Sequence, residues 1–394
     1  MSKIKVVTII TKLELGGAQK VALYTADGLG QDQRFESYFV SGEEGFLDET
    51  KNETYKNIKQ FFNIPEIIRE LNPIKDFIAF FKLWLLLKKI KPQIVHTHSS
   101  KAGILGRWAA FFAGVPTIIH TYHGFGFHDY QPFLIKKFYV IAERLSCIIA
   151  DKLVVVSHHN IQKALKEKVG KKEQYTVIRC GIEIQKYREK NVNIFAKKSD
   201  LNIPADAKVV GMVACFKDQK SPLDFVKIAA EILRQRQNVF FVMVGDGELR
   251  AAIEQKIKKF GIQNNIKLLG WRDDVVDIIK IFDVSVLTSL WEGLPMVILE
   301  SMASGIPVVA TMVDGTQEII KSEYNGFLVQ CHDVSDFVNK IMLVLDNPKI
   351  REKFVTNSNS LLVDEFDQTV VIQKIKDLYV GLTTPFPERS RREQ

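Results

Sequence analysis

Short apolar runs alternate with longer segments of helical apolar spacing along most of this 394-residue chain. The first unit is a strand over residues 5–11, a glycine-rich turn and a helix over residues 19–29. Further along, a helix begins at Pro222, and the Ser-Pro-Leu-Asp sequence from Ser221 predicts a capping box at its start. Strands followed by helices in this order indicate parallel sheets with helices on both faces.

A polar, lysine-rich segment over residues 188–206 holds no long apolar run and separates two such patterns. We therefore predict the α/β fold class, with two doubly wound, Rossmann-like domains that face each other across a cleft. The predicted parts are an N-terminal domain over 1–190, a linker over 191–206, a C-terminal domain over 207–365, a helix over 366–382 that returns to the N-terminal domain, and a Pro-rich, charged, disordered tail over 383–394. Ligands of such sheets lie beyond the carboxyl ends of the strands, so the cleft is the expected site.

Composition favours a globular protein that neither is secreted nor spans a membrane. Hydrophobic residues make up 46% of the chain and charged residues 25%, which argues against a disordered chain. The four cysteines stand far apart without a C-x-x-C pair, so we expect reduced thiols. The N-terminal apolar run lacks a cleavage site, and the stretch over 77–87 is interrupted by Lys82 and too short to span a bilayer. The prediction is a cytoplasmic protein.

Basic charge is concentrated in the N-terminal half. The formal net charge is +8; residues 1–190 contain 29 lysines and arginines against 19 acidic residues, and the remainder contains 25 against 27. This excess suits nucleic acid, an anionic membrane surface or a phosphorylated ligand, and a solvated basic face explains it equally well. No nucleic-acid-binding motif accompanies the charge. Aromatic residues lie among the lysines at 77–91 and 125–139; most are expected in the core, and the others suggest peripheral attachment to an anionic inner leaflet.

Residues 290–311, LWEGLPMVILESMASGIPVVAT, concentrate candidate chemistry between two predicted strands. Pro295 begins a helix whose first amides have no partner, which favours an anion at that end. Glu292 lies in the loop before the helix, and Glu300 lies one to two turns inside it. The alternative is that both acids only favour the positive end of the helix dipole, worth about 0.3–1 kcal/mol each.

The E-x7-E spacing of Glu292 and Glu300 resembles the motif of retaining glycosyltransferases of the GT-B fold, of the family 4 type that serves bacterial polysaccharide and glycoconjugate synthesis. Six further segments in family order support the resemblance. They are the Gly-Gly turn at 16–17, HTHSSKAGILGR at 96–107, HTYHGF at 120–125, VVVS at 154–157, VIRCGI at 177–182 and VGDGELR at 244–250.

The resemblance implies catalytic roles for three residues. Lys220 would neutralise the leaving diphosphate, Glu292 would face the transferred sugar and the phosphate, and His123 would approach the donor sugar from the N-terminal domain. Glu300 would accept hydrogen bonds from the ribose hydroxyls, which suits an ionised carboxylate. The other donor-binding residues that the resemblance implies are Gly16, Gly17, Asp246, Gly247, Glu248, Gly293, Leu294, Met296 and Val297, with the corner at 270–272 near the base.

One position departs from the family pattern. Family members commonly carry an arginine a few residues ahead of the lysine, whereas this chain has Cys215. A thiol supplies no such charge, so neutralisation would depend on Lys220, the helix N-terminus and Lys217. We leave Cys215 out of the site and expect it to be a small buried packing residue.

Neither a metal ion nor a cofactor is expected. No D-x-D carboxylate pair stands in an apolar frame, which favours stabilisation of the leaving group by fixed positive groups. His96, His98 and His120 have no carboxylate or cysteine at ligand spacing, so zinc is disfavoured. These three and His128 are expected to be structural histidines.

We therefore predict a retaining, metal-independent hexosyltransferase that moves a sugar from a nucleotide sugar, by family weighting a UDP-sugar, to a glycan or polyprenyl-diphosphate-linked acceptor. Two alternatives stay open. A nucleotide-sugar epimerase of similar two-domain fold would consume the donor without an acceptor, but it does not explain the E-x7-E spacing. A non-catalytic scaffold would bind sugar nucleotides without turning them over.

Overall fold

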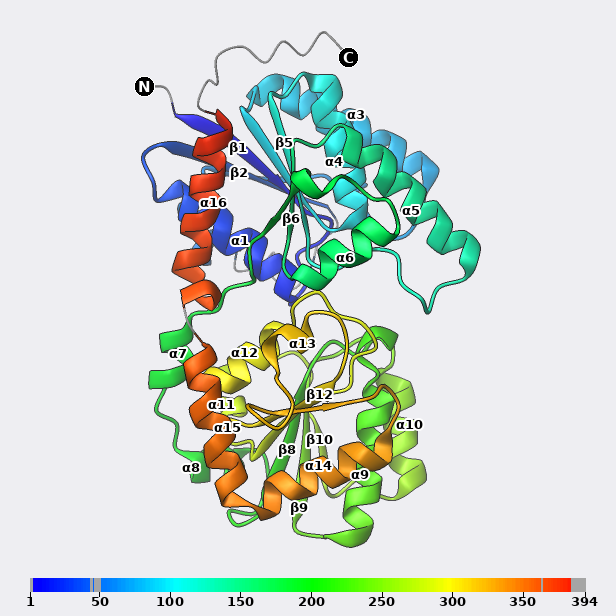
Figure 1. Cartoon of the computed structure of the whole chain (residues 1–394), viewed down its shortest axis with the longest axis vertical. Helices are drawn as coiled ribbons and strands as arrows, with labels where there is room; N and C mark the ends of the chain where they lie inside the picture. The colour runs from blue at the N-terminus through cyan, green and yellow to red at the C-terminus, as the bar shows by residue number, and fades with distance from the viewer. Residues whose placement is uncertain (1–2, 43–44, 46–50, 363, 384–394) are drawn as a thin grey trace. The chain divides into compact units, whose positions relative to one another are not determined.

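The computed structural model describes residues 3–42, 45, 51–362 and 364–383 (Figure 1). The chain forms two compact units, the first of residues 1–180 and 369–394 and the second of residues 181–368. Each unit contains one parallel sheet. The tail predicted over 383–394 lies outside the described residues, apart from Thr383.

Unit 1 contains a seven-stranded sheet of order β3-β2-β1-β4-β5-β6-β7. The strands are β1 (Ile4–Ile9), β2 (Phe35–Ser41), β3 (Gln60–Asn63), β4 (Ile94–His98), β5 (Thr117–Tyr122), β6 (Lys152–Val155) and β7 (Tyr175–Val177). The strand order reverses between β1 and β4, and ligands of doubly wound sheets bind beyond the carboxyl ends at such a reversal. The loops after these two strands are therefore where the sheet of unit 1 presents a site.

The helices of unit 1 cover both faces of its sheet. They are α1 (Gly17–Gly30), α2 (Lys51–Thr54), α3 (Pro73–Ile90), α4 (Ser100–Ala113), α5 (Phe133–Ile148), α6 (His158–Lys166) and α16 (Gln368–Thr383). Figure 1 shows α3, α4 and α5 on one face, and α1 with the C-terminal helix α16 on the other. This division follows from right-handed crossovers, because α1 leads toward one edge of the sheet and α3 to α5 lead toward the other.

A fully buried ion pair joins α4 to α5. Arg107 donates to Glu143 Oε2 at 2.6 Å, and the hydroxyl of Tyr122 donates to the same oxygen at 2.7 Å. Arg107 and Glu143 are both 0% exposed. The Arg107 Nε group also donates to the carbonyl of Gly103 at 2.8 Å, which fixes the guanidinium in the core. Burial opposes its charge, but the adjacent carboxylate prevails and holds the pKa of Arg107 above its usual value.

Unit 2 contains a six-stranded sheet of order β10-β9-β8-β11-β12-β13, which is the 3-2-1-4-5-6 order of a dinucleotide-binding fold. Its strands are β8 (Lys208–Val213), β9 (Val239–Val244), β10 (Ile266–Leu268), β11 (Val284–Leu287), β12 (Val308–Thr311) and β13 (Phe327–Val329). Its helices are α7 (Ile184–Glu189), α8 (Ile194–Asp200), α9 (Pro222–Gln235), α10 (Arg250–Phe260), α11 (Val275–Ile279), α12 (Met296–Ala303), α13 (Thr316–Ile319), α14 (Val334–Asp346) and α15 (Pro348–Leu361). The predicted fold class of two doubly wound α/β sheets is confirmed.

The segment that we expected to link two domains, residues 191–206, contains helix α8 and belongs to unit 2. Lys198 anchors it, because its ammonium group donates to the carbonyls of Ala205 at 3.1 Å and Ala207 at 2.8 Å. The segment lacks a long apolar run, so its sequence gave no sign of this packing.

The capping box predicted at Ser221 is wrong. Ser221 adopts the left-handed conformation, with φ 43° and ψ 52°, and its hydroxyl donates to the Asp224 carboxylate at 2.8 Å instead of accepting from a helix amide. An N-cap side chain typically reaches the first amides from an extended backbone, and the Ser221 side chain makes no cap bond.

Candidate active site

Two loops of unit 2 meet where its strand order reverses. The loop after β8 ends in a short 3-10 helix, Asp218–Lys220, and the loop after the neighbouring strand β11 carries residues 288–295. The backbone N–H of Leu290 donates to the Gln219 carbonyl at 2.7 Å, and the Gln219 side chain donates to the Trp291 carbonyl at 2.9 Å. These bonds hold Lys220 and Glu292 against each other, although the two residues are 72 positions apart.

The predicted catalytic residues Lys220 and Glu292 form an ion pair in this place. The ammonium group of Lys220 bonds to Glu292 Oε1, and the Ser289 hydroxyl donates to the same oxygen at 2.6 Å. The Asp314 carboxylate accepts the backbone N–H of Glu292 at 2.8 Å. Both side chains are largely buried, with 17% of Lys220 and 6% of Glu292 exposed, so their charges act on each other with little screening by water.

Helix α12 begins directly beyond this pair. Pro295 is its N-cap with an extended backbone, and Gly293 and Leu294 form the buried turn before it. The first amides of a helix have no partner within it, so those of Met296 and Val297 offer hydrogen-bond donors at the start of α12. The arrangement places a cation and helix amides at one end of the sheet, which is chemistry suited to a phosphate.

Glu300 lies in the second turn of α12 and faces Tyr187 of α7. Both residues are buried. Burial raises the pKa of Tyr187, and the charge of Glu300 and a hydrogen bond to it raise this pKa further. Sequence reasoning missed Tyr187, because no motif surrounds it and only the packing of α7 on α12 brings it there.

The Gly-Asp-Gly turn after β9 packs against the loop after β8. Gly245 has a φ of 126°, and a Cβ there would lie 2.0 Å from the Ala214 carbonyl oxygen, so only glycine fits. Asp246 accepts from the backbone of Gly247 at 2.8 Å and from Arg250 at 2.9 Å, so its carboxylate holds the turn. Glu248 is exposed. Donor contacts of Asp246, Gly247 and Glu248 stay a prediction.

Cys215 is partly exposed, so our expectation of a buried packing residue is wrong. The neighbouring residue, Phe216, is fully buried and fills the core position of this loop. The larger apolar side chain of this pair gains more from burial.

In unit 1, Gly16 and Gly17 follow β1 and begin α1. Gly16 adopts a φ of −132°, which any residue can adopt, and a Cβ there would meet only the flexible side chain of Gln19. Backbone strain therefore does not explain these glycines. A close approach to a ligand stays a prediction.

His123 follows β5, is partly exposed, and belongs to a histidine cluster whose other members are buried. Its Nε2 atom lies 2.9 Å from His98 Nδ1, with the two rings stacked, while its Nδ1 atom is buried without a hydrogen-bond partner among the described residues. Burial lowers the pKa of His123 to about 4, so the ring is neutral at physiological pH. If His98 donates in this pair, the single proton of His123 is on Nδ1.

The other members of the cluster have protein partners. His96 bonds to the Tyr379 hydroxyl of α16 at 2.5 Å and to Thr121 Oγ1 at 2.6 Å, and His120 bonds to Thr97 Oγ1 at 2.8 Å. Within the described part of the chain, no three His, Cys, Asp or Glu side chains are placed together to hold a metal ion. His96 and His120 thus bond to neighbouring side chains, and a structural role for these histidines stays a prediction.

We expect these buried histidines to make the protein less stable as the pH falls. Burial lowers the pKa of His96 from 6.5 to about 3, so the unfolded chain binds a proton below about pH 6.5 while the folded chain does not. Between about pH 7.5 and about pH 5.5, each such histidine should lower the free energy of unfolding by roughly 1.4 kcal/mol. Urea unfolding at both pH values measures the change.

His96→Phe should be less stable at both pH values, because Tyr379 and Thr121 lose a partner, but its pH dependence should be weaker than that of the wild type. His158→Gln, which alters an exposed ring, is the matched control and should keep the wild-type dependence. An unchanged dependence in His96→Phe would contradict the assignment.

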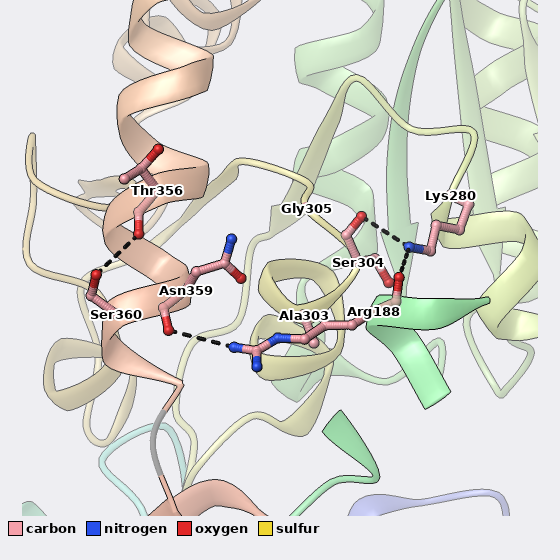
Figure 2. Close-up of a pocket in the computed structure, with 8 residues that line it drawn as sticks. All are labelled: Arg188, Lys280, Ala303, Ser304, Gly305, Thr356, Asn359 and Ser360. Atoms are coloured by element: carbon pink, nitrogen blue, oxygen red, sulfur yellow. Dashed lines mark hydrogen bonds between the residues drawn. The ribbon is translucent and has the colours of Figure 1, made fainter. Parts of the chain in front are cut away.

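A pocket of about 750 Å³ lies at the C-terminal end of α12 (Figure 2). Lys280 donates there to the Arg188 carbonyl at 3.4 Å and to the Ser304 carbonyl at 3.5 Å, and Arg188 donates to the Asn359 carbonyl at 3.4 Å. These bonds tie α7, α12 and α15 together. The eight residues of α12 span about 12 Å, which separates this pocket from Pro295, so we assign it no part in the chemistry.

Two family models and several known proteins match this chain. Residues 193–360 match the family model of glycosyl transferases group 1, and residues 15–186 match that of glycosyltransferase family 4. Over 384 residues the chain is 33% identical to the UDP-Gal:alpha-D-GlcNAc-diphosphoundecaprenol alpha-1,3-galactosyltransferase of Escherichia coli. The match covers 97% of this chain and 98% of that protein.

Other similarities extend over most of the chain. It is 24% identical over 367 residues to an alpha-1,4-N-acetyl-D-galactosaminyltransferase of Campylobacter jejuni that is named for a PP-undecaprenol-linked saccharide. The match covers 91% of this chain and 94% of that protein. The crystal structure of Anabaena HepE with UDP-glucose matches with a TM-score of 0.80 at 21% identity, covering 96% of this chain and 100% of that one.

Proposed function

Because this chain belongs to the group 1 and family 4 glycosyltransferases, we propose that it transfers a sugar from a UDP-sugar to an undecaprenyl-diphosphate-linked saccharide, with retention of configuration and without a metal ion. Two relatives named for undecaprenol-linked acceptors support the acceptor class. The galactosyltransferase, named for UDP-Gal, and the HepE complex with UDP-glucose support the donor class.

The observation that carries the proposal is the meeting of Lys220, Glu292 and the α12 N-terminus at the strand reversal of unit 2. In the proposed site, the diphosphate contacts the Lys220 ammonium and the amides of Met296 and Val297. Glu292, held by Ser289 and by its own backbone bond to Asp314, faces the transferred sugar.

One further residue in each unit has a proposed role. Glu300 accepts hydrogen bonds from the ribose hydroxyls, next to the hydroxyl of Tyr187. In unit 1, His123 donates through Nδ1 to a sugar hydroxyl, while His98 fixes the ring. Since the ring of His123 is neutral, it acts as a hydrogen-bond donor and not as a cation.

The proposed transfer step is set by the negative charge that develops on the leaving diphosphate. The acceptor hydroxyl attacks the anomeric carbon from the face of the leaving group, a new C–O bond forms, and the bond to the diphosphate breaks. The hydroxyl proton passes to the departing β-phosphate oxygen. Negative charge grows on that phosphate, where Lys220 and the helix amides stabilise it without reorganisation. No enzyme nucleophile is required.

A panel of nucleotide sugars tests the proposal, with and without an undecaprenyl-diphosphate saccharide and with and without EDTA. We expect UDP release from one UDP-sugar together with a longer lipid-linked glycan, unchanged by EDTA. Consumption of the donor without an acceptor would favour the epimerase, and binding without turnover would favour the scaffold. Loss of turnover in EDTA would overturn the metal-free mechanism.

Glu300→Gln should weaken UDP binding by about tenfold, because a neutral amide replaces the charged acceptor of the ribose hydrogen bonds. Isothermal titration calorimetry with UDP measures the dissociation constant. Glu231→Gln is the matched control, since the Glu231 side chain on α9 is 44% exposed and pairs with Arg234. This variant should bind UDP like the wild type. Wild-type affinity in Glu300→Gln would reject the ribose assignment.

The proposed acceptor also places the enzyme at the inner face of the cytoplasmic membrane. Among the helices of residues 3–42, 51–362 and 364–383, none combines the length and the apolar sequence needed to cross a bilayer. We therefore propose peripheral attachment, which brings the enzyme to an acceptor anchored by its polyprenyl chain.

A further inference from the structure

Helix α3 carries an apolar stripe on each of two opposite sides. The buried stripe consists of Ala79, Leu83, Leu87 and Ile90, and the exposed stripe consists of Ile74, Phe77, Ile78, Phe81 and Leu85. At 3.6 residues per turn, the centres of the two stripes lie roughly 180° apart around the helix. The inner stripe packs against the core of unit 1, while Ile74 is 75% and Phe77 is 63% exposed.

Helix α5 also carries an outward apolar stripe. Its buried side consists of Val140, Glu143, Ser146 and Cys147, and its exposed large apolar residues are Phe133, Leu134, Ile135, Phe138, Ile141, Leu145 and Ile148. Five of these, from Leu134 to Ile148, recur at spacings of three and four residues and form a straight outward stripe. Leu134 and Ile148, at its two ends, are both 77% exposed.

The two stripes belong to one surface, because α4 lies between their helices. The Trp84 indole N–H donates to the Phe112 carbonyl at 3.2 Å, and the Trp108 indole N–H donates to Ser146 at 3.1 Å, which ties α3 and α5 to α4. Figure 1 shows the three helices in one layer. We call the exposed residues of α3 and α5 given above, with Phe111 and Phe112 of α4, the apolar face. It holds 14 of the 23 exposed large apolar side chains of the described residues, so these residues form a patch and are not scattered singly over the surface.

Cations border the apolar face. Residues 73–91 contain five lysines and one acid, Asp76, which pairs with Lys101 at 2.6 Å. Residues 133–148 contain two lysines, one arginine and one acid, the buried Glu143. Lys88, Lys89 and Lys137 are exposed. Long basic side chains beside apolar stripes place their charge at the edge while their stems rest on the apolar surface.

We infer that the apolar face binds an anionic phospholipid bilayer, with α3 and α5 lying in the headgroup region. A helix with outward apolar residues and bordering lysines is suited to the membrane interface, where each basic residue adds about 1 kcal/mol. A second copy of the chain fits less well, since a two-fold dimer through this face would set lysines against lysines. The inference rests on the proposed function, because a lipid-linked acceptor is the reason for the enzyme to bind a membrane. The position of the binding surface comes from the structure of unit 1 alone.

Flotation of the full chain with vesicles tests the inference. Vesicles that contain phosphatidylglycerol should bind the wild type, and binding should fall in high salt and with vesicles of phosphatidylcholine alone. Replacing Leu134, Phe138, Ile141 and Leu145 together by glutamine should weaken binding at least about tenfold, because the α5 stripe loses its apolar contact. Lys88→Glu with Lys89→Glu, two exposed changes that spare the core, should weaken binding to the anionic vesicles alone.

Phe195→Gln with Leu343→Gln is the matched control, because both residues are exposed on unit 2, and it should bind like the wild type. The inference would be overturned if the wild type did not bind the vesicles. It would also be overturned if the α5 and lysine variants bound them as tightly as the wild type. A wild type that dimerises in light scattering and ignores vesicles would assign the face to a second copy and overturn it too. Transfer to a short-chain acceptor without a membrane should be unchanged in these variants, so failure of the proposed function is detected separately.

Discussion

Lys220→Met is expected to lower kcat/KM for sugar transfer by about 10²–10³-fold, because it removes a preorganised cation from the place where the leaving diphosphate gains charge. Methionine keeps the length of the side chain and much of its apolar contact. The loss should be mainly in kcat, since charge on the β-phosphate grows in the transition state. Steady-state kinetics with a UDP-sugar and a lipid-linked acceptor measure both constants.

Lys227→Met is the matched control for this variant. Lys227 forms an ion pair with Asp224 on the same helix, and its side chain is 43% exposed, so its replacement should leave kcat/KM within about twofold of the wild type. Combining Lys220→Met with Glu292→Gln should cost less than the sum of the two single changes, because the two side chains are bonded to each other. A Lys220→Met enzyme of near wild-type rate would remove Lys220 from the catalytic site.

The alternation of strand and helix in the sequence predicts the elements whose strands have a continuous apolar run and whose helices have a periodic one. β3, with the sequence QFFN and no buried residue, lacks such a run. The segment over 191–206 shows the limit of this approach. Helix α8 is short and polar, and it is held by the bonds of Lys198 to two carbonyls, which no hydrophobic pattern reports. Ser221 shows the same limit, since a cap depends on a backbone angle that the residue types alone do not set.

The candidate site also contains features that the sequence predicts and features that depend on the tertiary fold. Glu292 and the Pro295 turn carry a local signal, because the turn and the helix start are contiguous in sequence. The bond between Lys220 and Glu292 depends on β8 and β11 being neighbours in the sheet, and Tyr187 reaches Glu300 only through helix packing. Local patterns therefore predict which groups are present, and the tertiary fold decides which of them touch.

The aromatic and basic clusters of the N-terminal half were ambiguous for a related reason. In α3, both stripes have helical spacing and apolar residues, so the sequence does not distinguish the core side from the outer side. The expectation that most of the aromatic residues at 77–91 and 125–139 lie in the core is wrong. Phe125 and Phe127 are buried, but Phe77 and Phe133 are among those that are exposed. The exposed residues alone define the surface that we assign to the bilayer.

Arg107→Met should destabilise unit 1 by about 3–5 kcal/mol, because it leaves the carboxylate of Glu143 buried without its cation. Glu143 would keep only the Tyr122 hydroxyl as a partner, and the Gly103 carbonyl would lose the Arg107 donor. Urea unfolding measures the stability, and hydrogen exchange of peptides from α4 and α5 localises the loss. Arg234→Met, in an exposed pair with Glu231, is the matched control and should change stability by less than about 1 kcal/mol.

The double variant Arg107→Met with Glu143→Leu decides what the pair contributes. Removing both charges also removes the desolvation cost that each carries, so the double variant should recover most of the stability lost by Arg107→Met alone. Recovery would mean that the ion pair, at 0% exposure, adds little net stability. The stability lost in Arg107→Met would then come from the buried carboxylate that has no cation. A double variant as unstable as Arg107→Met would show instead that the bonds of the guanidinium to the α4 backbone and to Glu143 are themselves the main contribution.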